Sequence, residues 1–449
     1  MTVKRPKHRA RELPGGLLLR EMRTTDLDAM VEFVTRVFGT VMPNGEPDIK
    51  AGIWATELLR GDHPTTRPED GTLVLDQETG RIVASCFLIS QIWKYDDVRI
   101  AVGRPELIAS DPTYRGRGLV RELLQSTHEF SAELGQPIQA LTGIPYYYRQ
   151  YGYEPALVSE GGRSGGIESI PILDSGTAVG IRIRPAVEPD LPFITNVYDK
   201  AARRAMISAV RDQTIWRYEL LARDPGGDYW HELRIVEDSA SDSIGFFAYV
   251  AQLSGRSMIC TLAELSDDAM WPTVGPHLLS FLRRTGEALA TQIGDDCALI
   301  NFDWTSDHPF LSSCGTLLPD TDSPFAWYAR IGDIGVFIWH IAPVLERRLA
   351  ESDRAGYSGE TTITFYPNGL RLGFESGKLT VAEELAVAPH RTADAALPGR
   401  TILQLLLGSR TLNELEHAFP FETFTRNESS RHLLQTLFPK KPSAVWPVA

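Results

Sequence analysis

The stretch from Leu107 to Tyr153 constrains this chain more than any other part of its sequence. It reads LIASDPTYRGRGLVRELLQSTHEFSAELGQPIQALTGIPYYYRQYGY and combines an apolar run, a basic turn with two glycines, a helical pattern and an aromatic segment. Residues 106–110 are short and largely apolar, which predicts a buried strand. Residues spaced three and four apart from Val120 to Leu134 predict an amphipathic helix that Gly135 ends.

The turn between this strand and this helix carries Arg115, Gly116, Arg117 and Gly118. The first N–H groups of a helix have no partner within the helix, and the helix dipole favours an anion beside them. Glycine lets the backbone approach a phosphate closely, and arginine adds cationic hydrogen-bond donors. The sequence therefore predicts a pyrophosphate site at residues 115–121.

The composition excludes several classes of protein. A formal net charge of −13 argues against a nucleic-acid partner, because such proteins normally present a basic domain. No apolar run reaches the ~18 residues that a membrane span requires. The four cysteines form no C-x-x-C pair, and no cysteine or histidine cluster has metal-ligand spacing. We therefore expect a cytoplasmic protein with reduced cysteines, no metal and no membrane partner.

The 449 residues predict two to four domains, at the usual ~100–200 residues per domain. Residues 1–16 are basic and lack the apolar core of a signal peptide, so they predict a disordered lead-in. Residues 17–165 predict a first domain with a strand, two helices and a hairpin, followed by the strand, turn and helix described above.

A second domain is predicted over residues 166–325. Glycine-rich stretches at 161–166 and 176–180 predict a linker before it. Its beginning, residues 181–191, echoes residues 19–27, and a similar order of strands and helices follows in both domains. This recurrence indicates an internal repeat of one fold.

The second domain lacks the basic turn. At the equivalent place the chain reads Glu264-Leu-Ser-Asp267-Asp268-Ala-Met-Trp271-Pro272. Two carboxylates there would repel a pyrophosphate, so we expect cofactor binding in the first domain alone. Residues 326–449 predict a third domain, with a helix over 335–349 and a hairpin around Pro367-Asn-Gly369.

The stretch from Leu107 resembles the acetyl-CoA site of the GCN5-related N-acetyltransferases, or GNATs. Their Arg/Gln-x-x-Gly-x-Gly/Ala motif is matched from Arg115 onward, except that Val120 replaces a small residue. The chain is more closely similar to the enhanced intracellular survival (Eis) family of aminoglycoside acetyltransferases. That family carries a Pro-Thr-x-Arg-x-Arg-Gly-Leu turn, here 112–119, and a Tyr-x-x-aromatic-Gly-Tyr-x-Pro-Ala segment, here 148–156.

The resemblance implies an α+β protein with tandem GNAT folds followed by a sterol-carrier-protein-like α/β domain. It implies an acetyl-CoA-dependent N-acetyltransferase, an acyltransferase that modifies a primary amine of a small molecule such as an aminoglycoside. It also implies a homo-oligomer, in this family a hexamer.

N-acetyl transfer from a thioester needs an anchored pyrophosphate, a polarised carbonyl, an acceptor for the amine proton and a proton donor for the leaving thiolate. A tyrosine hydroxyl, with a pKa of about 10, can donate that last proton. By resemblance this donor is Tyr148. The resemblance also implies cofactor contacts at Ile108, Ala109, Ser110, Arg115, Gly116, Arg117, Gly118, Leu119, Val120, Arg121, Gly143 and Ile144.

The proton acceptor implied by the resemblance is the C-terminal carboxylate, carried by Ala449. The tail over 442–449 is apolar, which favours docking over solvation. Asp26 and Asp28 are weaker candidates to face an amine, because Asp26 stands where a helix N-cap belongs. Trp54 could shape an acceptor pocket, although its helical spacing also suits the core.

Two other functions stay open. A non-catalytic protein could bind CoA or an apolar ligand. Val120 and the Pro145-Tyr146-Tyr147 sequence, which replaces a Gly-Gly of the family, favour that alternative. Transfer to protein lysines or N-termini is the other alternative, and it predicts an exposed acceptor groove.

Overall fold

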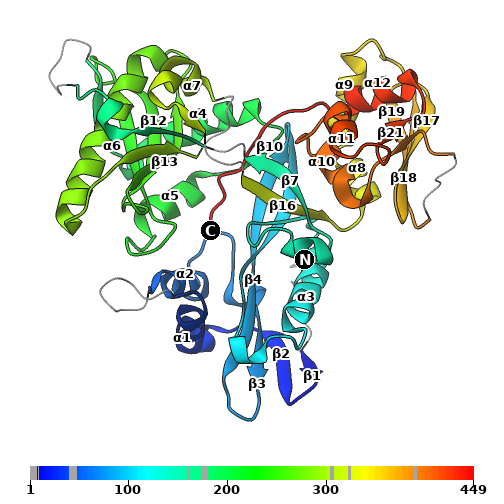
Figure 1. The fold of residues 1–449 in the computed structure, drawn as a ribbon, viewed down its shortest axis with the longest axis horizontal. Coiled ribbons are helices and arrows are strands. Elements are labelled where there is room, and N and C mark those ends of the chain that lie inside the picture. Colours follow the sequence, from blue (N-terminus) through cyan, green and yellow to red (C-terminus); the bar gives the residue numbers. More distant parts are fainter. Residues whose placement is uncertain are drawn as a thin grey trace. The chain divides into compact units, whose positions relative to one another are not determined.

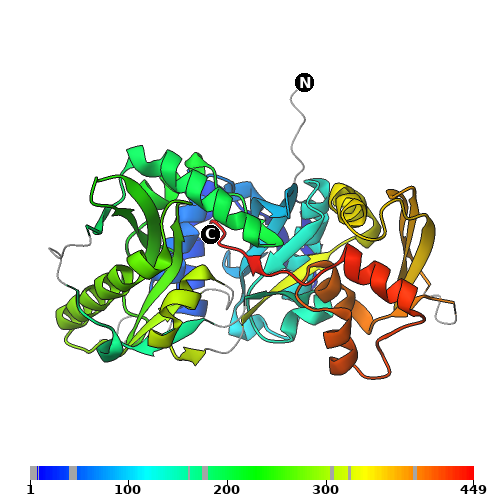
Figure 2. The same cartoon turned by 90° about the horizontal axis from the view of Figure 1, so that it is seen from above.

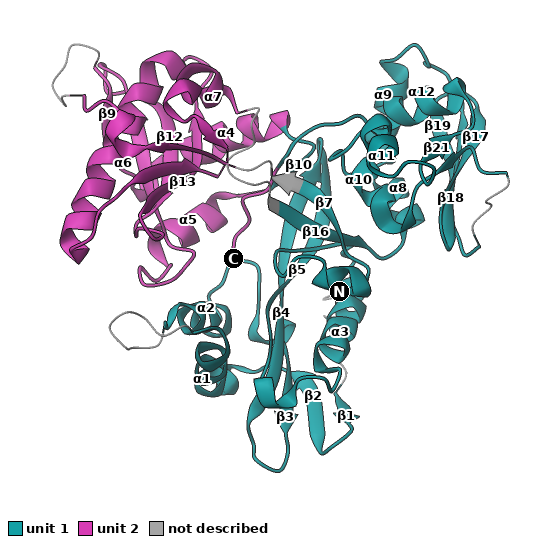
Figure 3. Cartoon of the chain, in the orientation of Figure 1, with its two compact units in different colours: residues 1–158, 205–209, 326–443 teal, residues 159–204, 210–325, 444–449 magenta. Residues whose placement is uncertain are grey.

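The computed structural model describes residues 8, 10–39, 48–159, 162–173, 180–303, 308–321, 325–387 and 392–449. The chain divides into two compact units (Figure 3). Unit 1 comprises residues 1–158, 205–209 and 326–443, and unit 2 comprises residues 159–204, 210–325 and 444–449. Each unit is therefore assembled from segments that are far apart in the sequence. The domain boundaries at 17–165, 166–325 and 326–449 stay a prediction.

A ten-stranded sheet organises the N-terminal part of unit 1 (Figure 1). Its main path runs β1-β2-β3-β4-β5-β6-β16-β7. The strands are β1 (Arg11–Leu13), β2 (Leu17–Glu21), β3 (Thr72–Asp76), β4 (Ile82–Tyr95), β5 (Val98–Ser110), β6 (Ile138–Leu141), β7 (Glu154–Ser159) and β16 (Phe325–Ile331), with β10 (Ile207–Ala209) and β22 (Ser443–Ala444) beside them. β5 and β6 are parallel, so the chain must cross over between them, and the helix that follows β5 forms this connection.

Helices cover both sides of this sheet. α1 (Leu27–Phe38) and α2 (Lys50–Leu59) lie on one side, and α3 (Leu119–Glu133) lies on the other (Figure 1). β4 is buried over most of its length, as expected for a central strand with both faces covered. The predicted helices and the β3–β4 hairpin are confirmed, with small shifts at their ends.

The strand predicted over 106–110 is confirmed as the end of β5. β5 is longer than predicted and starts at Val98, because it pairs with β4 along nearly its whole length. The lead-in over 1–16 was expected to be disordered, but Arg11–Leu13 form β1 and pair with β2. His8 is also buried, with Nδ1 3.2 Å from the hydroxyl of Ser126.

The C-terminal part of unit 1 is built on a five-stranded sheet with order β19-β18-β17-β20-β21. Its helices lie on one side of that sheet (Figures 1 and 2). The strands are β17 (Gly359–Phe365), β18 (Asn368–Glu375), β19 (Lys378–Leu385), β20 (Ala395–Ala396) and β21 (Phe424–Thr425). The helices are α8 (Ile334–His340), α9 (Ala342–Ala350), α10 (Ile402–Leu406), α11 (Leu412–Ala418) and α12 (Glu428–Leu437).

The single helix predicted over 335–349 is divided into α8 and α9. Pro343 has no N–H to donate to the preceding turn, so it suits the first turn of a new helix better than the interior of a long one. α11 was not predicted, although Thr411 and Glu414 form a capping box that marks its start. The segment over 326–331, predicted to open the third domain, is the strand β16, which pairs with β6 of the first sheet.

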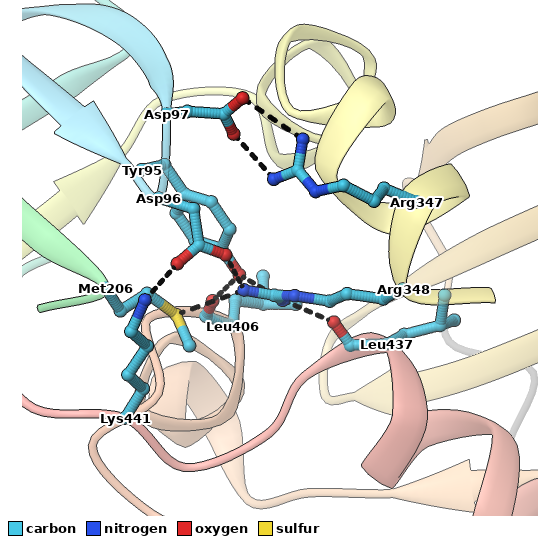
Figure 4. Close-up of polar contacts among 9 residues, drawn as sticks. All are labelled: Tyr95, Asp96, Asp97, Met206, Arg347, Arg348, Leu406, Leu437 and Lys441. Atoms are coloured by element: carbon cyan, nitrogen blue, oxygen red, sulfur yellow. Dashed lines mark hydrogen bonds and ion pairs between the residues drawn. The ribbon is translucent and has the colours of Figure 1, made fainter. Parts of the chain in front are cut away.

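The turn between β4 and β5 joins the two parts of unit 1 (Figure 4). Asp96 lies 2.5 Å from Nη2 of Arg348 and 2.6 Å from Nζ of Lys441. Asp97 pairs with Arg347 at 2.6 Å. The Tyr95 hydroxyl donates to the carbonyl oxygen of Leu406 at 2.8 Å. Two adjacent carboxylates thus hold three cations that come from α9 and from the segment after α12.

Unit 2 contains a seven-stranded sheet with order β15-β8-β14-β13-β12-β11-β9. The strands are β8 (Arg163–Gly166), β9 (Arg182–Pro185), β11 (His231–Glu237), β12 (Ser243–Val250), β13 (Ser257–Leu265), β14 (Leu299–Phe302) and β15 (Asp320–Thr321). The helices are α4 (Leu191–Ala201), α5 (Gln213–Leu221), α6 (Trp271–Ile293) and α7 (Pro309–Cys314). β13 and β14 are parallel, as β5 and β6 are in unit 1.

The linker predicted over 161–166 was wrong in part. Residues 163–166 form β8, which pairs with β14. A Cβ on Gly165 would lie 2.1 Å from the carbonyl oxygen of Leu317, so glycine permits a close backbone approach here. Of the other stretch predicted as linker, residues 176–179 lie outside the described residues.

The two units share an equivalent set of side-chain contacts before their first helices. In unit 1, Arg20 pairs with Asp26 at 2.8 Å, and the N–H of Arg23 donates to the same carboxylate at 2.9 Å. In unit 2, Arg184 pairs with Asp190 at 2.6 Å, and the N–H of Val187 donates to it at 2.8 Å. Asp26 therefore binds Arg20 and the N–H of Arg23 before α1, and a role of Asp26 toward an acceptor amine stays a prediction.

Candidate functional site

The candidate site begins near the end of β5. Glu106 of β5 pairs with Phe87 of β4, and Ala109 pairs with Ser85. Two residues of β5, Leu107 and Ile108, therefore lie opposite one residue of β4 and form a β-bulge. Leu107 has φ 45°, and its carbonyl oxygen accepts a hydrogen bond of 2.9 Å from Ser85. β5 pairs with β6 only as far as Gly103, so the two strands separate before the bulge. Bulges of this kind redirect backbone groups beside active sites.

The basic turn follows the bulge. Gly116 has φ 75° and Gly118 has φ 77°, and a Cβ on either would meet nothing within 4 Å. Both glycines are therefore needed for their left-handed backbone and not for space. All four residues from 115 to 118 are exposed.

The N-terminus of α3 has free hydrogen-bond donors. Gly118 is its N-cap and provides no side-chain cap, and the N–H groups of Leu119 and Val120 have no acceptor among the described residues. The guanidinium groups of Arg115, Arg117 and Arg121 form no ion pair with a described carboxylate. Arg117 and Arg121 lie over the rings of Tyr114 and Tyr151, contacts that leave their charge without an anionic partner. Free N–H groups and arginines without an ion pair at one helix start fit a pyrophosphate.

Tyr148 lies in a 3-10 turn, Tyr147–Tyr151, that follows β6. Its side chain is 6% exposed, and burial raises its pKa. The hydroxyl is therefore protonated at neutral pH, as a proton donor must be. A Cβ on Gly143 would lie 2.7 Å from Cε2 of Tyr148, so glycine at 143 lets the ring approach the backbone.

The bulge, the turn and the tyrosine meet in one apolar cluster. Tyr148 packs with Tyr153 and Tyr328, and Ile108 and Val120 are partly buried against this group. Val120, which stands where the family pattern has a small residue, thus packs against this cluster. The structure therefore brings together predicted site residues that are up to forty residues apart.

The loop over 143–147 takes its shape from β16. Tyr146 has φ 61°, and its N–H donates to the hydroxyl of Tyr328 at 2.6 Å. Ile144 is 63% exposed, so its side chain is accessible to a ligand. A residue of β16, which is distant in sequence, therefore holds the loop in which Pro145, Tyr146 and Tyr147 replace the family's glycines.

Sequence reasoning missed a buried carboxylate in β5. Glu106 lies 2.5 Å from Nη2 of Arg104, and the two side chains are 9% and 2% exposed. Burial raises the pKa of Glu106, which makes it a better proton acceptor near neutral pH. The sequence could have indicated this pair, because Arg104 and Glu106 lie two residues apart in an apolar strand and therefore share one face of the sheet.

The C-terminal tail is anchored within unit 2. The carbonyl oxygen of Trp446 accepts a hydrogen bond of 2.9 Å from Arg211, whose guanidinium also lies 4.1 Å from the Trp446 ring centroid. Val448 and Ala449 are 2% and 1% exposed. Docking of the apolar tail is confirmed. The catalytic role of the Ala449 carboxylate stays a prediction, because Ala449 and Tyr148 belong to different units.

Within the described part of the chain, no group of three His, Cys, Asp or Glu side chains could hold a metal ion. No helix in that part is long and apolar enough to cross a membrane.

Residues 19–156 match a protein family described as "Acetyltransferase (GNAT) domain". This stretch contains the bulge, the basic turn and Tyr148. It is a GNAT acetyltransferase domain, a fold that uses acetyl-CoA as its co-substrate and binds an acceptor molecule.

Solved structures share the fold over almost the whole chain. A probable N-acyltransferase from Enterococcus faecalis has a TM-score of 0.64 at 16% identity and covers 95% of this chain and 97% of its own. A GCN5-related N-acetyltransferase from Anabaena variabilis has a TM-score of 0.62 at 15% identity, covering 96% and 99%. Eis1 from Mycobacterium abscessus has a TM-score of 0.58 at 17% identity, covering 95% and 98%. No protein with a curated description matches the sequence.

Proposed function

We propose that this protein transfers an acetyl group from acetyl-CoA to a primary amine of a small molecule. The observation that carries the proposal is the apolar cluster that Tyr148 shares with residues beside the start of α3. Tyr148 is buried and protonated in this cluster, and Val120, whose N–H is one of the free donors at the helix start, is partly buried against the same cluster. A phosphate anchor and a proton donor thus lie in one site.

Each residue of the site has a role in this chemistry. Acetyl-CoA supplies an acetyl thioester. The N–H groups and arginines of the turn, residues 115–121, hold the pyrophosphate. N–H groups of Ile108, Ala109 and Ser110, at and after the bulge, hydrogen-bond the carbonyl oxygen. Gly143 and Ile144 contact the pantetheine side, and Tyr148 delivers a proton to the departing sulfur.

The acceptor amine must lose a proton before or as it reacts. We propose the C-terminal carboxylate of Ala449 for this step. Its support is the anchored tail, which fixes the last residues of the chain. Glu106 is the second carboxylate to test, because it lies in β5 two residues before Ile108.

The resemblance to the Eis family supports further proposals about the domains, the oligomeric state and the acceptor. We propose that unit 2 carries a second GNAT fold without a cofactor site, and that the C-terminal part of unit 1 is sterol-carrier-like. We also propose an Eis-like hexamer in the cytoplasm and aminoglycosides among the acceptors. The equivalent order of strands and helices in the two units supports the tandem fold.

The first test replaces Tyr148 by Phe. We expect kcat to fall by roughly 10²- to 10⁴-fold, because general acid catalysis contributes about that much. Acetyl-CoA affinity should change little, since the apolar ring stays in place. Tyr147→Phe is the matched control, because Tyr147 lies in the same turn and its hydroxyl contacts that of Tyr151 at 3.3 Å. A wild-type rate in Tyr148→Phe would rule out the assigned role.

An acceptor screen separates the alternatives. Purified protein is given acetyl-CoA with aminoglycosides, polyamines or lysine peptides, and CoA release is measured. Deletion of Ala449 and Glu106→Gln are assayed with the best acceptor, and the variant that loses turnover identifies the base. Thermal stabilisation by acetyl-CoA without transfer to any acceptor would favour a binding protein instead.

A further inference from the structure

A cleft of about 860 Å³ lies in unit 1 along one face of α3. Tyr148 is not among the residues that line it. One wall is α3 itself, and the other walls come from the 3-10 turn after β6, from β16 and α8, and from the turn before α10. The polar lining side chains on which its chemistry depends are Arg121, His128, Gln139, Arg330, His340 and Arg400.

Two guanidinium groups of the cleft lining lie beside Gly152. A Cβ built on Gly152 would lie 3.5 Å from Nε of Arg330 and 3.5 Å from Cζ of Arg400, so both arginines approach the same point of the backbone. Gly152 has φ 88°, a left-handed backbone that favours glycine there. Arg330 donates a hydrogen bond of 2.6 Å to Oε1 of Gln139, which fixes its position.

Neither arginine forms an ion pair with a described carboxylate. Burial lowers the pKa of Arg330, and the charge of Arg400 lowers it further. Arginine stays charged in proteins, so the two groups repel each other at all ordinary pH values. An anion between them would remove this repulsion and accept charge-assisted hydrogen bonds from both.

The carboxylates in the cleft have other partners. Asp333 accepts the N–H of Val336 at 2.9 Å and caps α8, and Glu129 accepts from Gln125 at 3.0 Å. Burial lowers the pKa of His128 to about 3, so this imidazole is neutral, and its Nε2 lies 2.8 Å from the Tyr153 hydroxyl. The cleft lining therefore carries three permanent cations, Arg121, Arg330 and Arg400, and two carboxylates that already accept hydrogen bonds from other groups.

We propose that this cleft binds a phosphate-type dianion between Arg330 and Arg400. Arg330 lies on β16 and Arg400 lies in the turn before α10, and both are outside residues 19–156, which match the GNAT family. Arg121 links the cleft to the basic turn, because it belongs to the first turn of α3 and also lines the cleft.

The phosphate could come from two sources. One is the 3′-phosphate of a CoA molecule whose pyrophosphate occupies the turn, and this source rests on the proposed function. The other is a separate phosphate-bearing ligand, and this source does not depend on the proposed function.

The test measures binding to the full-length protein by calorimetry, with CoA, dephospho-CoA and inorganic phosphate as probes. If CoA is the source, CoA binds at least tenfold more tightly than dephospho-CoA, and Arg330→Gln and Arg400→Gln bring that ratio close to one. If the source is a free anion, the two cofactors bind equally, and phosphate binds the wild type but neither variant.

Arg371→Gln is the matched control, because Arg371 is an exposed arginine of β18 that pairs with Glu383 at 2.6 Å. It should leave all three affinities unchanged. If Arg330→Gln does not fold, Arg400→Gln carries the test, since its side chain is exposed. Wild-type affinities in both variants would overturn the proposal. Binding of phosphate without any binding of CoA would uphold it while contradicting the proposed function.

Discussion

The same junction of strand and helix occurs twice in this protein and has diverged. In unit 1 it joins β5 to α3 through an exposed basic turn with two left-handed glycines. In unit 2 it joins β13 to α6, and the helix starts at Trp271-Pro272 after an extended Met270. Trp271 packs against Phe310 with ring centroids 5.3 Å apart. The first junction presents donors to a ligand, whereas the second packs on its own unit.

The two junctions also differ in charge. Arg115, Arg117 and Arg121 have no described carboxylate partner, whereas Asp267 pairs with Lys200 at 2.6 Å. The two junctions show that the same order of strand and helix forms with or without a basic turn, because the buried strands and helices do not depend on it.

Unit 2 has a different specialised feature, a buried arginine network that holds the chain end. Arg211 lies 2.9 Å from Glu219, which also contacts Arg223 at 3.2 Å, and all three side chains are nearly fully buried. Trp446 lies against Arg211 and Trp216. The tail of the chain therefore packs beside α5 of unit 2 and not at the junction between β13 and α6.

Trp446→Ala should have the largest effect on stability. It removes an aromatic ring and a cation–π contact, so we expect the free energy of unfolding of unit 2 to fall by about 2–3 kcal/mol. Hydrogen exchange over residues 210–237 measures the loss. Trp339→Ala in α8 is the control, because Trp339 is exposed and its loss should cost less. Equal costs would contradict an anchoring role for the tail.

Asp26→Asn and Asp190→Asn should each cost about 2 kcal/mol in their own unit, since each removes charge-assisted hydrogen bonds. Equal losses of stability would support the proposal that the two units repeat one fold, and a loss confined to one unit would contradict it. Urea unfolding followed by unit-specific hydrogen exchange measures both.

The same pair predicts a pH dependence. Burial alone would raise the pKa of Asp26, but the hydrogen bond and charge of Arg20 outweigh it and lower the pKa. The hydrogen bond from Arg184 lowers the pKa of Asp190. Both carboxylates therefore stabilise the fold above the unfolded pKa of about 3.9. This contribution disappears as pH falls through the lower folded pKa, and the Asn variants should lack that acid-sensitive component.

Gly118→Ala should weaken acetyl-CoA binding by roughly 5- to 30-fold, because a left-handed backbone costs an alanine about 1–2 kcal/mol. Gly294→Ala is the matched control, since Gly294 is left-handed with φ 70° at the end of α6. That control should lose stability without losing affinity. Calorimetry with acetyl-CoA distinguishes the two, and equal affinities would show that the turn does not hold the cofactor.

Asp267→Asn should have the smallest effect. Its ion pair with Lys200 is exposed, so we expect a change in stability below about 0.5 kcal/mol. Acetyl-CoA affinity should stay at the wild-type value, and a gain in affinity would indicate that unit 2 retains a cofactor site.

Local patterns were enough for much of the fold. Residues spaced three and four apart determined α1, α3 and α6, and Pro367-Asn-Gly369 determined the β17–β18 hairpin. They were not enough where pairing is non-local. β8 reads as a glycine-rich linker, and β16 reads as the start of a new domain, because only their partners β14 and β6 make them strands.

For the site, the basic turn and the aromatic segment could be predicted from the sequence alone. A left-handed glycine turn and the start of a helix depend on residues that are adjacent in the sequence, so a local pattern indicates them. Only the tertiary structure decided what surrounds them. It placed Tyr328 beside Tyr148, paired Glu106 with Arg104 out of solvent, and brought Arg330 and Arg400 to Gly152. These contacts join residues from distant segments, and no spacing along the chain records them.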